Sequence, residues 1–126
     1  ETWNESERFW RTDMEHREIY WTEQLTHCKN LSQFFNKSDH CADVAERMPT
    51  LKLKCIAWLH DTPMTRTELI RQEVAPEVVC AIVRLTMPIR SVKEDLLATT
   101  VKEADLMQHI QDGEDLQEEL DELRCR

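Results

Sequence analysis

The chain contains 126 residues, 40% of them hydrophobic and 33% charged, and its formal net charge is −9 at pH 7. This length suits one domain with a hydrophobic core, and the acidic charge argues against general nucleic-acid binding, which needs clustered Lys and Arg. A single glycine leaves few positive-φ positions for hairpins, which makes an all-β fold improbable. Good helix formers are abundant, so we expect one all-α domain, a bundle of about six to eight helices.

The five cysteines include no CxxC pair, and several lie in apolar runs where a free thiol behaves as a small hydrophobe. This usage is typical of a reduced protein, so we expect a cytoplasmic location. No apolar run approaches the ~20 residues that a membrane-spanning helix needs, so we expect no membrane contact.

Residues 1–35 are rich in aromatic side chains and predict one long helix or two stacked helices. Apolar positions recur there at roughly helical spacing. They are Phe9, Trp10, Ile19, Tyr20, Leu25, Leu31, Phe34 and Phe35. The dense aromatic set Trp3, Trp10 and Tyr20 has two interpretations: it packs on the domain core, or it forms a surface for a partner or a second copy of the chain.

Residues 36–112 predict the core of the domain, which begins after a polar break. Ser38 or Asp39 is suited to cap a helix that starts at His40. Pro49 cannot continue that helix, so we expect it to be short.

The next two core helices have clear start signals. Thr50 precedes an apolar run that ends at His60-Asp61, and Pro63 stops it. The residues from Thr65 to Glu68 have the S/T-x-x-E form of a capping box, which predicts another short helix.

Two longer helices complete the predicted core. Pro76 stands at a first helical position, apolar residues follow it, and Pro88 closes the segment. A helix over residues 100–110 carries Asp105 and ends at Gly113.

Residues 113–126 predict an acidic, amphipathic C-terminal helix. Leu116, Leu120 and Leu123 fall on one stripe of it. This stripe and the aromatic N-terminal helix are the two candidate surfaces for a homo-oligomer.

Chemistry-bearing residues occur in the order H…HD…D: His40, His60-Asp61 and Asp105. Two imidazoles and two carboxylates suit a divalent transition metal such as Mn, Fe, Ni, Co or Zn. The alternative for His60-Asp61 is a plain helix end, where His is favoured and Asp caps the next turn.

Several segments around these residues resemble the motifs of one protein family, in the order in which that family has them. Residues 40–46 (HCADVAE) resemble the pattern H-x-x-x-V-A, and residues 56–61 (IAWLHD) resemble A-x-L-L-H-D. Residues 101–105 (VKEAD) resemble VK-x-AD, and the turn after the HD and the segment 77–86 resemble the motifs between them. Together they resemble the HD superfamily of metal-dependent phosphohydrolases, most of all its small nucleotide and alarmone-hydrolase branch.

This resemblance implies an HD-type helical bundle in which His40, His60, Asp61 and Asp105 hold the metal. The expected substrate is a nucleotide, an alarmone or another phosphorylated small molecule, from which phosphate or pyrophosphate is removed. Asp61 is suited to orient the attacking water as general base. His27 competes with His40 as first ligand, but His40 carries the V-A signature and is preferred.

Three further residues are candidates for substrate binding. Lys102 lies three residues before Asp105, on the same helical face, where it reaches a phosphate or pairs with a neighbouring Glu. Arg47 and His27 are weaker candidates. His109 and His16 are expected to be ordinary surface residues.

The chain departs from the family pattern in two places. Alarmone hydrolases carry an acidic pair in the form H-D-x-x-E-D, whereas Thr62, Pro63 and Met64 follow the HD here. The family often continues its last motif as ADR…N, whereas this chain has Leu106 and His109. Two alternatives to an enzyme therefore stay open: a degenerate HD domain that binds a nucleotide or a protein, and a structural helical module for oligomerisation.

Overall fold

A computed structural model describes residues 5–35 and 38–125, with side chains described for 13–35 and 39–125. Within these residues the chain folds into a single compact domain of eight helices without a strand. The predicted all-α class is confirmed. The aromatic residue Trp3 lies outside the described residues, and so do the side chains of Phe9 and Trp10.

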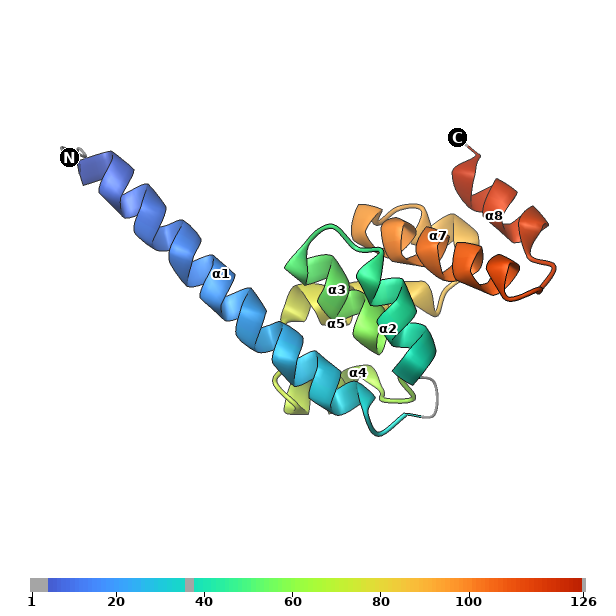
Figure 1. The fold of residues 1–126 in the computed structure, drawn as a ribbon, viewed down its shortest axis with the longest axis horizontal. Helices are drawn as coiled ribbons and strands as arrows, with labels where there is room; N and C mark the ends of the chain where they lie inside the picture. Colours follow the sequence, from blue (N-terminus) through green and yellow to red (C-terminus); the bar gives the residue numbers. More distant parts are fainter. Residues whose placement is uncertain (1–4, 36–37, 126) are drawn as a thin grey trace.

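The helices follow one another with short connections (Figure 1). Their bounds are α1 Glu5–Ser32, α2 Ser38–Glu46, α3 Leu51–Leu59, α4 Arg66–Arg71, α5 Pro76–Leu85, α6 Ile89–Val92, α7 Leu96–Gln111 and α8 Gln117–Arg124. The N-terminal segment forms one long helix rather than two stacked ones.

Local signals account for the starts of α3, α4 and α5. The Thr50 hydroxyl accepts a hydrogen bond from the backbone N–H of Leu53, and Thr65 accepts one from Glu68, both at 3.2 Å. Both predicted caps are confirmed, and Pro76 occupies the first turn of α5 as expected. Gly113 has φ 98° just after α7, a conformation that favours glycine.

Several helix bounds differ from the predictions, among them the start of α8, which lies at Gln117 instead of near residue 113. Helix α2 begins at Ser38, so Asp39 lies inside its first turn rather than before it. Helix α7 begins at Leu96 instead of near residue 100, because the Asp95 carboxylate caps the N–H groups of the first turn. The one-turn helix α6 had no predicted counterpart.

Helix α3 lies at the centre of the domain, in contact with α1, α2, α5 and α7 (Figure 1). Its residues Cys55, Ile56, Ala57 and Leu59 are fully buried, as expected for a helix that is apolar nearly all round. Burying each large aliphatic side chain stabilises the fold by about 1.5–3 kcal/mol. The end of α3, which carries His60, is thereby fixed between its neighbours.

Helix α1 packs on the core only along its C-terminal part. Cys28 and Leu31 are buried there, whereas Met14 and Ile19 are more than half exposed. In Figure 1 the N-terminal part of α1 extends away from the other helices. Tyr20 is the member of the aromatic set whose side chain is described, and it is 43% exposed, so the surface for a partner or a second copy stays a prediction.

A second apolar cluster joins α6, α7 and α8. Leu120 and Leu123 are buried in it together with Leu106 and Val92. Leu120 and Leu123 of the predicted leucine stripe are therefore used inside the chain, where they pack against α6 and α7.

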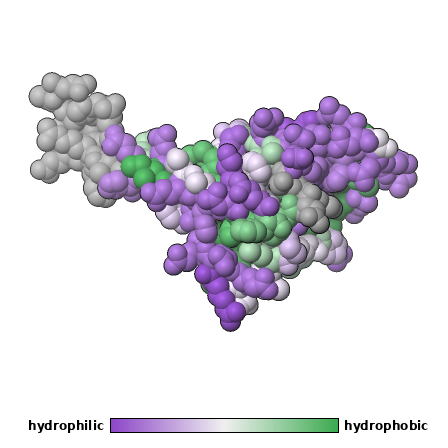
Figure 2. Space-filling model, turned by 60° about the horizontal axis from the view of Figure 1, so that its bottom comes forward, coloured by the Kyte–Doolittle hydropathy of each residue, from purple (hydrophilic) through white to green (hydrophobic). Residues whose placement is uncertain are grey.

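Hydrophilic residues cover most of the face shown in Figure 2, with a smaller apolar area near its centre. Cys28, Cys41 and Cys55 are free thiols that are buried as small apolar residues. In the part of the chain that the structure describes, no helix combines the length and the apolar character needed to cross a membrane.

Candidate metal centre

The four predicted ligands come together where α2, α3 and α7 meet. His40 lies in α2, His60 directly follows α3, and Asp105 lies in α7. Each of these residues and Asp61 offers a ligand atom, and these atoms all lie within 4.8 Å of one another. The order H…HD…D along the sequence thus becomes one cluster in space.

Asp105 is at the centre of the cluster. Its Oδ1 atom is 2.6 Å from Nε2 of His40 and 3.1 Å from Nε2 of His60. The Nε2 atom of His60 is also 3.3 Å from Oδ2 of Asp61. The side chain of His60 is only 4% exposed and that of Asp61 is 28% exposed, so Asp61 forms the more open side of the site.

Local structure fixes how His60 presents its ring. The Nδ1–H group donates to the carbonyl of Ala57 one turn earlier, at 2.5 Å. This hydrogen bond leaves Nε2 as the atom that faces Asp105. Metal-ligating histidines typically hold their second ring nitrogen in the same way.

The charges of the cluster shift the pKa values of its members. Burial lowers the pKa of His60, but hydrogen bonds to Asp105, Asp61 and Cys41 outweigh it and raise that pKa to about 12. For Asp105, burial raises the pKa, but its partners His60 and His40 bring it well below the usual range. The metal-free site therefore contains a protonated His60 paired with an ionised Asp105.

This set of donors fits a divalent transition metal. Imidazole nitrogens suit Zn, Cu, Fe and Ni, and carboxylates suit harder ions such as Mn. The four atoms are close enough to bind a single ion, and the Asp105 carboxylate is already ionised. The residues present therefore match the predicted ligand set His40, His60, Asp61 and Asp105.

Lys102 lies at the edge of this cluster. Its Nζ atom is 3.8 Å from Oδ2 of Asp105, and its side chain is 25% exposed. A cation in this position neighbours the candidate ligands and also contacts solvent, as a phosphate-binding residue requires.

Arg47 lies between α2 and α7, farther along both helices. Its guanidinium donates to the side-chain oxygens of Gln108 at 3.1 Å and Gln111 at 2.7 Å. These three residues line a polar groove together with Asp43 and Glu46. The two carboxylates make this groove less favourable for a phosphate than the surroundings of Lys102.

The structure does not bring His27 to the cluster. Its Nε2 atom is 2.5 Å from the carbonyl oxygen of Gln72, just after α4. His27 therefore ties α1 to the end of α4, a packing role that differs from the predicted substrate contact.

His109 is the residue beside the cluster that the sequence analysis did not place there. Predicted as a surface residue, it places Nε2 3.2 Å from Oδ1 of Asp105, and its ring centre is 4.4 Å from that of His40. Its side chain is 26% exposed, and its Nδ1 contacts a carboxylate oxygen of Glu114. The available signal was its i,i+4 spacing from Asp105, which puts both residues on one helical face.

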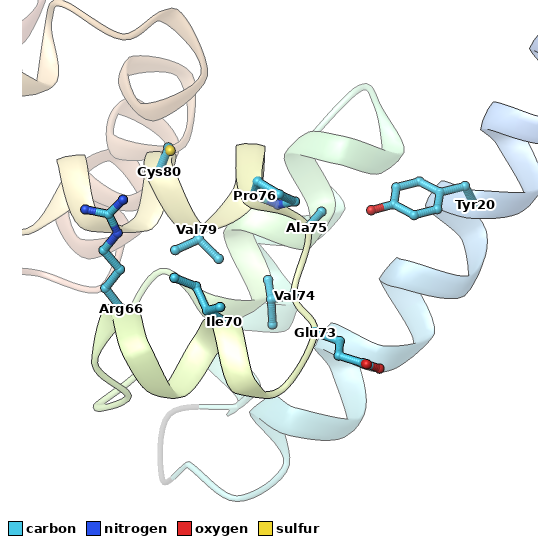
Figure 3. A pocket seen from close by; sticks show the side chains of 9 residues that line it. All are labelled: Tyr20, Arg66, Ile70, Glu73, Val74, Ala75, Pro76, Val79 and Cys80. Atoms are coloured by element: carbon cyan, nitrogen blue, oxygen red, sulfur yellow. The ribbon is translucent and has the colours of Figure 1, made fainter.

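A separate apolar groove of about 400 Å³ lies between α1, α4 and α5 (Figure 3). Tyr20, Ile70 and Val79 are among its lining residues, and none of the four candidate ligands is. This groove is therefore distinct from the candidate metal centre.

No match to this chain was found among protein-family models, curated proteins or solved structures. The resemblance to HD phosphohydrolases thus stays a prediction from the sequence motifs. The convergence of the His and Asp side chains is a property of the structure itself.

Proposed function

We propose that this protein is a metal-dependent phosphohydrolase of the HD type, which removes phosphate or pyrophosphate from a nucleotide or alarmone. One observation carries this proposal. Two histidines and two aspartates from α2, α7 and the end of α3 place their ligand atoms within 4.8 Å of one another, in the order that the family motifs predict. A chance HD dipeptide at a helix end would not gather its partners in this way.

His40, His60, Asp61 and Asp105 would hold the ion. When bound, a divalent metal lowers the pKa of water and offsets the negative charge of a phosphate. The protein contributes a largely buried pair, His60 and Asp105, that keeps the ligand atoms in place on one side.

Asp61 is proposed to act as the general base. Its carboxylate is the most exposed of the four candidate ligands, and His60 lies on its inner side at 3.3 Å. A carboxylate so placed can hold and accept a proton from water that arrives from solvent.

Lys102 is proposed to bind the substrate phosphate. Its ammonium group is a compact point charge next to the cluster, where it can donate to phosphate oxygens. The chain as a whole carries a net charge of −9, which favours one small phosphorylated ligand over a nucleic acid.

The test is a nucleotide screen with the purified chain in the presence of added Mn²⁺, Co²⁺ or Ni²⁺. The panel includes nucleoside mono-, di- and triphosphates and guanosine polyphosphates, and phosphate or pyrophosphate release is measured. We expect turnover that His60→Ala and Asp61→Ala abolish, while His16→Ala, a change on the exposed part of α1, leaves it intact. Equal rates in all variants would show that the activity belongs elsewhere.

A degenerate HD domain that binds a nucleotide without turnover is the second candidate. It is favoured by the turn after Asp61, where Thr62 accepts a hydrogen bond from the backbone of Met64 and Thr65 caps α4. These positions stabilise the turn and supply no acidic pair. Metal-dependent nucleotide binding by calorimetry, with no product in the same sample, would favour this candidate over the enzyme.

A further inference from the structure

Three imidazole rings converge on one oxygen atom of Asp105. The distances from Oδ1 to the Nε2 atoms are 2.6 Å for His40, 3.1 Å for His60 and 3.2 Å for His109. A single carboxylate oxygen accepts about two hydrogen bonds. His40 and His60 already reach this oxygen as hydrogen-bond partners, so the close approach of His109 Nε2 is a third contact that hydrogen bonding does not explain.

His109 is oriented in the way that a metal ligand is. Its Nδ1 contacts the carboxylate of Glu114, which leaves Nε2 directed at Asp105. His60 has the same arrangement, with Nδ1 bonded to the carbonyl of Ala57 and Nε2 directed at Asp105. Such second partners fix the tautomer and ring direction of metal-binding histidines.

The positions of Asp105 and His109 on α7 also suit joint coordination. They are spaced i,i+4, so both project from one face of the helix. The same spacing allows two side chains of one helix to share a zinc ion in H-E-x-x-H motifs. Oδ1 of Asp105 and Nε2 of His109 are 3.2 Å apart. Two neighbouring ligand atoms on one ion, each at a metal–ligand distance of about 2.1 Å, are expected to be ~3 Å apart.

We propose that His109 is an additional ligand of the metal centre and that Glu114 positions its ring. This inference rests on the metal centre of the proposed function and deepens it. His109 then adds a third imidazole next to the four residues whose ligand atoms lie within 4.8 Å of one another, and it joins them through its contact with Asp105. Because imidazole is a better ligand for Zn²⁺, Fe²⁺, Co²⁺ and Ni²⁺ than for Mg²⁺, the centre selects the former ions.

In the experiment the full chain is stripped of metal and titrated with Co²⁺. The affinity for Co²⁺ is measured by chelator competition, and the visible absorption spectrum is recorded. Removing a ligand changes the spectrum, because the spectrum reports the number and type of ligands. We expect His109→Ala to weaken Co²⁺ binding by about 10- to 100-fold or more and to alter the spectrum. His16→Ala serves as the histidine control and should change neither.

Glu114 gives a second, independent test at an exposed position, where substitution leaves the fold intact. Glu114→Ala should weaken Co²⁺ binding by about tenfold, because the ring of His109 is no longer held. Glu114→Gln keeps an acceptor for Nδ1–H and should restore most of the affinity. If circular dichroism shows that His109→Ala does not fold, Glu114→Ala and Glu114→Gln still test whether His109 is a ligand.

Two results would overturn the inference, and they can be told apart. Wild-type affinity and spectrum in both His109→Ala and Glu114→Ala would remove His109 from the centre while leaving the four-residue site in place. Absence of Co²⁺ binding in the wild type, or binding that His60→Ala does not affect, would overturn the metal centre itself and the proposed function with it.

Discussion

His40 and Asp105 are separated by 65 positions in the sequence, yet Nε2 of the histidine lies 2.6 Å from Oδ1 of the aspartate. Their side chains are 14% and 9% exposed. This contact joins α2 to α7 and sits beside the contact of His60 with the same oxygen. Asp105 is therefore the residue on which both the packing of these helices and the candidate metal centre depend.

Replacing Asp105 by Asn should affect binding and stability together. The change removes the negative charge that the imidazoles share and leaves buried N–H groups without a full-strength acceptor, which costs about 1–3 kcal/mol. We expect a lower free energy of unfolding in urea and no detectable Co²⁺ binding. Asp112→Asn, an exposed change just after the same helix, is the control. Normal stability and metal affinity in Asp105→Asn would contradict the central role of this carboxylate.

Metal binding should release a proton. His60, with its pKa raised to about 12, is protonated in the metal-free protein at neutral pH, whereas a metal needs the neutral imidazole. Affinity for Zn²⁺ should therefore fall as pH is lowered. Calorimetry in two buffers of different ionisation enthalpy measures the protons released, and equal apparent enthalpies would contradict a protonated His60.

The raised pKa of His60 also determines how the free energy of unfolding of the metal-free protein changes with pH. Because the pKa of His60 is raised, protonated His60 stabilises the fold in full below pH 6.5, which is its ordinary pKa. This stabilisation is lost as the pH rises through about 12. The pKa of Asp105 is lowered, so its contribution is present above 3.8 and is lost in acid. Urea unfolding at several pH values should show this loss below pH 4, and Asp105→Asn should reduce it.

Lys102→Ala should weaken substrate binding and leave the metal in place. A charge-assisted hydrogen bond to phosphate contributes about 1.5–3 kcal/mol, which corresponds to a rise in KM of about 10- to 100-fold. Lys102→Arg keeps the charge and should retain more of the affinity. An unchanged KM in Lys102→Ala, with normal Co²⁺ affinity, would assign Lys102 to its ion pair with Asp105 alone.

Ile56→Ala should test the central position of α3. Ile56 is fully buried, so truncation leaves a cavity and should lower the free energy of unfolding by about 2–5 kcal/mol. Ile19→Ala is the matched control, because Ile19 is 56% exposed on α1. Equal stability of the two variants would mean that α3 is not the core of the fold.

The predictions that succeeded concern signals contained within one or two helical turns. Thr50, Thr65 and Pro76 mark helix starts through contacts with their immediate neighbours, so the sequence suffices to locate them. The early start of α7 was missed, although Asp95 carried a local signal for it. The four-residue α6 was missed because so short an apolar turn has no recognisable period.

The amino-acid sequence by itself determined the all-helical class and named the four residues of the candidate metal centre. Composition and helix caps are local properties, and the order H…HD…D was visible along the chain. Only the tertiary structure decided that His109 joins this cluster, that His27 serves packing and that Leu120 and Leu123 are used inside the chain. The physical reason is that each of these roles depends on which helix lies opposite, and the crossing of α2, α3 and α7 follows from burial of the whole core rather than from any one segment.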